Sequence, residues 1–445
     1  MQTRRPAMGQ TERDRDAQEI VRVFQPRAFV LETNHALSPG RLASTIQAMT
    51  FAAASIRGNS FWLALARLSA HALGVLFIAF AARRLGAADF GQFSFIAAAL
   101  LVGNAFTTFG SDTLLIRELA RAGKATDLLP RAFALQLAFS SLWVIVTIIL
   151  EPNSLLLLYS LSLFPLALSS IASAAMRGFE RMDLFWLAGL VNSLAQLIAV
   201  VLSWDLLSLC VFLTIGYIAA ALVSLAICSA SFPTFSLLPL LDFRPIFSLA
   251  LPFALLATMS ILSQRLGIFS VATLISEREA GYFSAAARVV EGLKLGHYAV
   301  LGALLPAMSR AAQGAMRNFR VSFPGLLGFS ALLAGAVTLT ARPIVNLLYG
   351  ADYAPSIELL TVLAWTLAPY TVSAFLSVDL VARGREGTLV KATAISLGVF
   401  LVLYLWLIST HQLTGAACAA LMGEIIQAVI LVIATTNDQR LTTND

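Results

Sequence analysis

Long apolar runs, each about long enough to cross a lipid bilayer, recur along the chain from Phe61 to near its end. Short turns that contain charge, Pro or Gly separate them. Because a membrane helix needs roughly 20 mainly apolar residues, this pattern predicts about twelve transmembrane helices. We expect them near residues 62–82, 92–111, 131–150, 154–175, 184–204, 206–229, 247–270, 283–306, 324–341, 356–380, 389–409 and 412–433.

Composition agrees with this pattern. Hydrophobic residues make up 58% of the 445 residues and charged residues 12%, and the mean hydropathy is +0.82. Such a chain cannot dissolve as a globular protein, so the predicted fold class is an all-α polytopic membrane protein. Cys210, Cys228 and Cys418 stand singly in apolar runs, so we expect no disulfide framework, no metal site and no cofactor.

The first 58 residues differ from the rest, because they are polar, mixed in charge and without a sustained apolar period. They predict a disordered cytoplasmic head, unless Met49 is the true first residue. The first apolar run carries Arg67 and His71 and no small-residue cleavage site follows it. We therefore expect this run to remain as the first span rather than to be removed as a signal peptide.

The formal charge of +6 and the pI near 9.5 come mainly from Lys and Arg in short loops between apolar runs. Loops on one side of the predicted membrane hold most of them, as the positive-inside rule requires. We therefore expect both termini to be cytoplasmic and the protein to lie in the bilayer, with no nucleic-acid partner.

Two segments of the second half repeat segments of the first half. Residues 275–284 resemble 85–94, in each case a polar turn whose Gly and aromatic residue open a span, and residues 382–387 resemble 176–181. The shared register predicts two six-helix lobes in parallel orientation. The predicted domains are the head (1–58), an N-terminal lobe (59–231), a linker (232–246), a C-terminal lobe (247–435) and a cytoplasmic tail (436–445).

The motifs LGAADFGQF (85–93), FGSDTLLIRELAR (109–121) and AGYFSAAAR (280–288) support a family resemblance. In order and spacing they resemble polysaccharide and O-antigen flippases of the multidrug/oligosaccharidyl-lipid/polysaccharide exporter superfamily, from about Phe61 to the last span. Such proteins often carry an acid just before an Arg late in the seventh span, whereas this chain has Gln264 before Arg265. The resemblance therefore does not supply an ion-coupling acid at that position.

The resemblance implies a V-shaped central cavity between the lobes, a place in the bacterial inner membrane, and an undecaprenyl-diphosphate-linked oligosaccharide as substrate. It also implies a polysaccharide polymerase and glycosyltransferases as candidate partners.

Cations inside the predicted spans are the sharpest functional signal. An Arg or Lys at mid-bilayer costs roughly 2.5–3.5 kcal/mol on insertion scales, so several together are not expected to face lipid. Arg67 and His71, four residues apart, share one helix face. The functional interpretation is a cationic, water-filled cavity that attracts a diphosphate; the alternative is that these side chains snorkel or form buried pairs. The candidate cations are Arg67, His71, Arg265, Arg288, Lys294 and His297.

Three acids are candidates for ion coupling or for charge pairing. Glu291 lies between Arg288 and Lys294 at spacings of three, and we expect it to neutralise one of them. Asp112 and Glu424 are placed towards the ends of predicted spans, where a solvated or paired role is the alternative to coupling.

Three classes of function fit a chain of this kind. The first is a flippase that moves a lipid-diphosphate-linked oligosaccharide by alternating access. The second is a cation-coupled multidrug antiporter of the same superfamily, which should line its cavity with carboxylates. The third is a membrane polysaccharide polymerase or ligase, which should show a long polar outer loop and catalytic groups; the sequence shows neither. We therefore expect a transporter rather than an enzyme.

Overall fold

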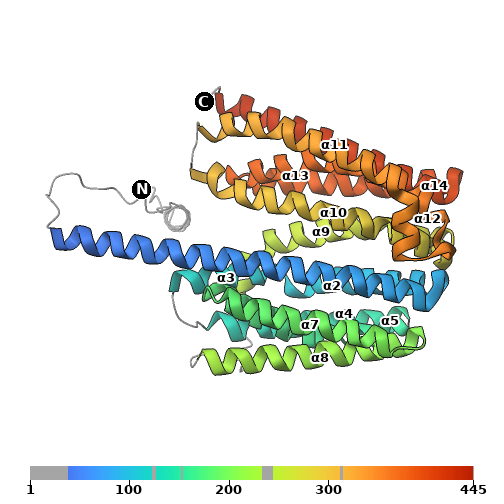
Figure 1. Ribbon diagram of the computed structural model, residues 1–445, viewed down its shortest axis with the longest axis horizontal. Helices are drawn as coiled ribbons and strands as arrows, with labels where there is room; N and C mark the ends of the chain where they lie inside the picture. The colour runs from blue at the N-terminus through green and yellow to red at the C-terminus, as the bar shows by residue number, and fades with distance from the viewer. Residues whose placement is uncertain (1–38, 123–126, 152–153, 233–243, 311–313, 444–445) are drawn as a thin grey trace, which may run out of the picture. The chain divides into compact units, whose positions relative to one another are not determined.

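The computed structural model describes residues 39–122, 127–151, 154–232, 244–310 and 314–443 (Figure 1). Its contacts divide the chain into two units, Met1–Arg57 and Gly58–Asp445, and the predicted spans lie in the second. Throughout the described ranges the regular structure is helical. The helices before the predicted linker are α2 (Pro39–Thr108), α3 (Ser111–Ala122), α4 (Leu128–Leu150), α5 (Leu155–Ser160), α6 (Leu163–Gly178), α7 (Met182–Leu202) and α8 (Leu206–Ser231).

The second half repeats this alternation of long helices and short turns. Its elements are α9 (Arg244–Leu274), α10 (Glu277–Arg310), α11 (Gly314–Leu348), η1 (Ala351–Tyr353), α12 (Pro355–Leu363), η2 (Ala364–Thr366), α13 (Leu367–Ala382) and α14 (Glu386–Thr443).

The number of membrane passes agrees with the prediction from hydropathy. The described residues contain nine helical segments that are long and apolar enough to cross a bilayer. Two of these have 51 residues each, and a non-helical residue, Gly86 in α2 and Gln412 in α14, divides each into two passes. Helix α10, with 34 residues, is long enough for a further pass but is less apolar than these nine segments. The predicted fold class, an all-α polytopic membrane protein of about twelve spans, is confirmed.

Two terminal segments extend helices beyond the predicted lobes. Residues 39–57 were predicted to belong to a disordered head, but they form the start of α2. Pro39 suits the first turn of a helix, where no N–H is needed, and residues 41–57 contain neither Gly nor Pro to interrupt it. Similarly, α14 continues through Thr443 into the predicted tail. Residues 1–38 and most of the predicted linker lie outside the described part of the chain.

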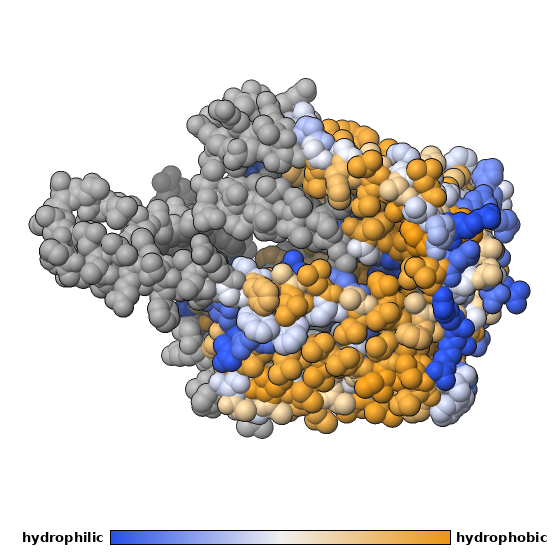
Figure 2. Space-filling view, viewed as in Figure 1, coloured by the Kyte–Doolittle hydropathy of each residue, from blue (hydrophilic) through white to orange (hydrophobic). Residues whose placement is uncertain are grey.

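The surface of the helices is suited to lipid. Figure 2 shows hydrophobic residues over most of the described face, and hydrophilic residues gathered mainly along the right-hand edge of the view. Large apolar side chains such as Ile149 (74% exposed) and Leu339 (86% exposed) project from the spans. Exposed apolar area of this extent indicates a bilayer rather than water as the surrounding medium.

The described helices pack in two groups. Helices α3 to α8 pack mainly on one another, as do α9 to α14, and among these helices the packing between the groups joins α9 to α3 and α4. We call these groups the first and second bundle, with the part of α2 from Gly58 onward in the first. Next to this contact between α3 and α9, Phe109, just before α3, stacks on Phe247 of α9 with ring centroids 4.8 Å apart. The lobe boundaries predicted from the sequence remain predictions.

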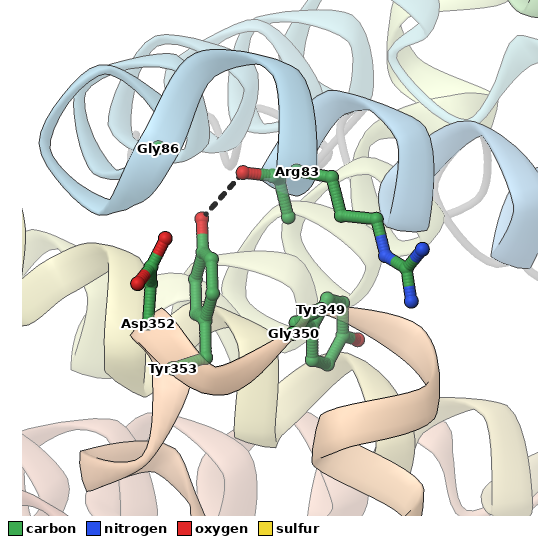
Figure 3. A pocket seen from close by; sticks show the side chains of 7 residues that line it. Arg83, Gly86, Tyr349, Gly350, Asp352 and Tyr353 are labelled. Carbon is green, nitrogen blue, oxygen red and sulfur yellow. Dashed lines mark hydrogen bonds between the residues drawn. The ribbon is translucent and has the colours of Figure 1, made fainter.

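The bundles also meet at the other end of their helices, the end that carries the turn at Gly86 and is called the Gly86 end below. Gly86 has φ of +74°, which permits the sharp turn between the two halves of α2. Close to it, the Tyr353 hydroxyl donates a hydrogen bond to the Ala82 carbonyl across the bundles at 2.9 Å (Figure 3). Arg83 donates to the Leu347 and Leu348 carbonyls at the end of α11, with 3.0 Å to Leu348. The Gly86 end is therefore closed by contacts between the bundles.

Candidate substrate site

A group of charged side chains from α9 and α10 forms the first part of the site. Arg265 donates through Nη1 to Glu291 Oε1 at 2.6 Å and through Nη2 to Oε2 at 3.2 Å. Arg288, one helical turn before Glu291, donates to Oε2 at 3.1 Å. One carboxylate thus bridges two guanidinium groups, one on each helix.

A second ion pair lies one turn further along α10. Lys294 Nζ donates to Glu424 Oε1 of α14 at 3.0 Å, and both side chains are about 15% exposed. The Lys294 ammonium also lies 4.2 Å from the ring centroid of Tyr370, from α13. A cation over an aromatic face gains electrostatic attraction, so this ammonium is held from two sides.

The spacing of these residues on α10 explains why they separate into two groups. Three residues are slightly less than one helical turn, so each step of three changes the direction in which the side chain points. Arg288 and Glu291 therefore remain neighbours, whereas Lys294, two steps from Arg288, faces a different helix. Of the two partners predicted for Glu291, the structure shows Arg288 and adds Arg265. Lys294 instead pairs with Glu424, for which no partner was predicted.

The local charge is not balanced. Among the described side chains of this group, Arg265, Arg288 and Lys294 contribute three positive charges and Glu291 and Glu424 contribute two negative ones, so one positive charge is left. Arg265 is only 8% exposed, and the Nε atoms of Arg265 and Arg288 are buried without a hydrogen-bond partner among the described residues. Buried guanidinium N–H groups without acceptors are costly, so this group of side chains favours a further anionic ligand.

Arg67 and His71 lie elsewhere, on the first part of α2. Both are exposed, and their spacing of four places them on one face, as predicted. Within the described residues neither forms an ion pair, and Arg67 is close enough to Arg177 of α6 for the two charges to interact. The structure therefore does not bring Arg67 and His71 into contact with the α10 cations. The side chain of His297 lies outside the described residues.

Asp112, the third acid, lies in α3 within a polar network of the first bundle. Ser170 donates to Asp112 Oδ1 at 2.5 Å, and Gln136, which is fully buried, donates to Ser111 Oγ at 2.8 Å and to Asp112 Oδ1 at 3.4 Å. Burial raises the pKa of the Asp112 carboxyl, although the Ser170 bond, the charge of Arg177 and the Gln136 bond oppose this. Asp112 is thus paired with polar groups rather than solvated.

Sequence reasoning did not select two residues that contact these charges. Gln136 is a polar residue in an otherwise apolar span, which is a signal that the sequence carries. Tyr370 carries no comparable signal, because tyrosine in a membrane helix commonly serves packing or interfacial anchoring. Only the fold brings Tyr370 beside Lys294.

Fold and charge together define a class, a helical membrane protein with charged side chains held among its membrane helices. The model of the polysaccharide biosynthesis protein family matches residues 56–312, which is more than half of the chain. The chain belongs to this family. The family resemblance predicted from its motifs is thereby confirmed.

Solved structures of the same fold are membrane transporters and flippases. An inward-facing multidrug resistance MATE family transporter of the MOP superfamily has a TM-score of 0.68 and 14% identity, over 84% of this chain and 96% of that one. The lipid II flippase MurJ in an inward closed conformation has a TM-score of 0.68 and 15% identity, over 84% of this chain and 87% of that one. An outward-facing multidrug resistance MATE family transporter has a TM-score of 0.63 and 14% identity, over 88% of this chain and 97% of that one. A comparison with curated protein sequences finds no significant match.

At these identities the likeness shows the fold alone. Fold and family together support a multi-pass membrane protein of the flippase or transporter class with a role in polysaccharide biosynthesis.

Proposed function

We propose that this protein is a flippase that moves a lipid-diphosphate-linked oligosaccharide across the bacterial inner membrane by alternating access. The family match supports the polysaccharide part of this proposal, and the fold supports transport. The observation that carries the substrate class is the unbalanced positive charge of Arg265, Arg288 and Lys294 inside the membrane helices. An undecaprenyl-diphosphate carrier is the lipid that the family resemblance implies.

The mechanism follows from the chemistry of such a substrate. Its diphosphate is anionic, its sugars are polar and its tail is apolar. The planar guanidinium fork binds phosphate oxygens through two parallel hydrogen bonds, which an ammonium cannot do. We propose that Arg288 and Arg265 bind the diphosphate, that Arg67 and His71 on α2 attract it from the first bundle, and that the lipid tail remains in the bilayer.

The orientation of the chain is part of the proposal. The distribution of Lys and Arg supports cytoplasmic positions for both termini. The closed Gly86 end is then the outer end, and we propose that the substrate reaches the site from the cytoplasm, where lipid-linked precursors are made. The proposed partners are the glycosyltransferases that supply the substrate and the polymerase that uses it.

Translocation in proteoliposomes tests this proposal. A labelled lipid-diphosphate oligosaccharide is incorporated with the purified protein, and the label that moves between leaflets is measured over time against protein-free vesicles. We expect the wild type to accelerate movement and Arg288→Ala to reduce the rate at least about tenfold, since a charge-assisted bidentate contact is lost. Arg278→Ala is the matched control, because Arg278 is an exposed arginine in the first turn of α10, about three turns before Arg288 on the same helix.

Two outcomes would overturn the proposal. If the wild type moves no lipid-linked glycan but exports cationic drugs, the protein is an antiporter. If it lengthens the glycan instead of moving it, the protein is a polymerase. Equal rates for Arg288→Ala and Arg278→Ala would remove the assigned role of Arg288.

A further inference from the structure

Glu291 occupies the position that an anionic ligand of the two arginines would take. Its two carboxylate oxygens accept three hydrogen bonds, two from Arg265 and one from Arg288. Carboxylate and phosphate groups present similar pairs of oxygens to a guanidinium fork. The same donors can therefore serve Glu291 or a phosphate, but not both in full.

The bridge is incomplete and asymmetric. Among the described residues neither Nε atom has an acceptor, so Glu291 does not satisfy the two guanidinium groups. The acid is also the most accessible member of the three, with 29% of its side chain exposed against 21% for Arg288 and 10% for Arg265. The arginines are thus held more deeply than the carboxylate between them, which favours movement of Glu291 rather than of Arg265.

The neighbouring pair of Lys294 and Glu424 is an example of a cation whose charge is compensated. Lys294 has one carboxylate partner, Glu424, and an aromatic face, Tyr370, so its charge is compensated. In the bridge, by contrast, two guanidinium charges share a single carboxylate. The excess positive charge therefore lies at Arg265 and Arg288.

We infer that Glu291 is an internal counter-anion that binds Arg265 and Arg288 when the site is empty and releases them to the diphosphate of the substrate. This inference rests on the proposed function and deepens it by assigning a specificity-determining residue. A site of two bare arginines inside a membrane would be costly when empty and would hold a diphosphate tightly. An acid that competes with the substrate reduces both effects, so the product can leave and the empty carrier can return.

Binding of inorganic pyrophosphate to the purified, full-length protein tests this inference without transport. Isothermal titration at fixed ionic strength is carried out on the wild type, Glu291→Gln and Glu118→Gln. We expect Glu291→Gln to bind pyrophosphate about tenfold more tightly, because a competing negative charge has been removed. Glu118→Gln is the matched control: Glu118 also contacts two arginines, Arg117 and Arg121, but on α3 outside the site, and its removal should leave the affinity unchanged.

Thermal unfolding of each variant shows whether it is folded, and Glu291→Asp provides a second variant that keeps the charge on a shorter side chain. We expect Glu291→Asp to have an affinity between those of the wild type and Glu291→Gln. Equal or weaker pyrophosphate binding by both variants, or a gain in Glu118→Gln as large as in Glu291→Gln, would overturn the inference. Absence of pyrophosphate binding in all variants would overturn it as well.

The translocation assay separates this inference from the proposed function. For Glu291→Gln we expect a lower KM for the lipid-linked glycan together with a lower kcat, since binding tightens and release slows. A purely structural ion pair would lower kcat without lowering KM. If the wild type moves no lipid-linked glycan while pyrophosphate affinity still rises in Glu291→Gln, the proposed function fails and the competition at the arginines stands.

Discussion

Gly91 and Gly281 pack backbone against backbone between the two bundles. A Cβ atom on Gly91 would overlap the Glu277 carbonyl oxygen, and one on Gly281 would overlap the Ala87 carbonyl oxygen. Each glycine thus faces the residue four positions before the other, so the contact is reciprocal. The two residues hold the same place in the repeated segments 85–94 and 275–284. The two repeated segments therefore pack against each other and close the Gly86 end.

Gly281→Ala should open this contact. The added methyl group has no room, and overpacking of this kind costs about 1–3 kcal/mol. This is enough to raise the ratio of molecules with an open Gly86 end to molecules with a closed one roughly tenfold. The measurement is the rate at which a membrane-impermeant thiol reagent modifies Ala82→Cys, a fully buried position at the Gly86 end, in a chain whose exposed Cys418 is replaced by Ser.

Gly292→Ala is the control for that measurement, because a Cβ at Gly292, on the same helix α10, would meet nothing within 4 Å. Equal modification rates in the Gly281→Ala and Gly292→Ala backgrounds would show that the contact does not close this end.

Tyr353→Phe should weaken the same closure by a separate route. Burial raises the pKa of the Tyr353 hydroxyl, which therefore remains a hydrogen-bond donor to Ala82 at physiological pH. Losing this bond leaves the Ala82 carbonyl without its donor and should lower the free energy of unfolding by about 1 kcal/mol. Chemical unfolding in detergent measures the change, with Tyr349→Phe as the neighbouring tyrosine control. A loss in Tyr349→Phe as large as in Tyr353→Phe would speak against the assigned bond.

Asp112 predicts a specific dependence of stability on pH. Burial raises its pKa in the folded state, so its contribution to stability is fully present below the unfolded pKa and is lost as the pH rises through the folded pKa. Asp112→Asn removes this loss of stability at high pH, because asparagine has no carboxyl group to ionise. The gain in thermal stability of Asp112→Asn over the wild type should therefore be larger at pH 7 than at pH 4.

Asp205 provides a contrast of opposite sign. The Ser208 hydroxyl and backbone N–H lower the pKa of the Asp205 carboxyl, which caps α8. Its contribution is present above the unfolded pKa and is lost as the pH falls through the folded pKa. Asp205→Asn should thus be less stable than the wild type at pH 7, and the difference should shrink in acid. Parallel pH profiles for the two variants would contradict at least one of the two assignments.

The pair of Lys294 and Glu424 should behave as one unit in a double-mutant cycle. Lys294→Ala leaves a mostly buried carboxylate without its partner, and Glu424→Ala does the same to the ammonium, so each should cost about 3 kcal/mol. The double variant should be no less stable than either single variant, because no unpaired charge remains. Additive losses in the free energy of unfolding would indicate that the two residues act independently.

Much of the fold can be predicted from the sequence, because membrane spans are long and uniformly apolar. The polar breaks at Gly86 and near Gln412 predict the ends of spans, and the repeat around Gly91 and Gly281 predicts two equivalent halves. The helix over residues 39–57 was missed because the first 58 residues are polar as a whole, although Leu42, Ile46, Met49 and Ile56 recur at helical spacing near the end of this segment.

The site is less accessible to sequence reasoning. Cations within spans mark Arg265, Arg288 and Lys294 as important, and the spacing on α10 indicates a bond between Arg288 and Glu291. The partners contributed by other helices are not encoded locally. Glu424 follows Lys294 by 130 residues, and only the packing of α14 against α10 brings them together. Which acid neutralises which cation therefore depends on the tertiary structure.

The central claim is that the site recognises the anionic linkage of a lipid-linked glycan. The most direct measurement compares the initial translocation rates of two labelled lipids with the same glycan and tail, one joined by a diphosphate and the other by an uncharged linker, in proteoliposomes of the wild type. We predict that the diphosphate lipid moves at least about tenfold faster, since the uncharged lipid cannot engage Arg265 and Arg288. Equal rates for the two lipids would contradict the account.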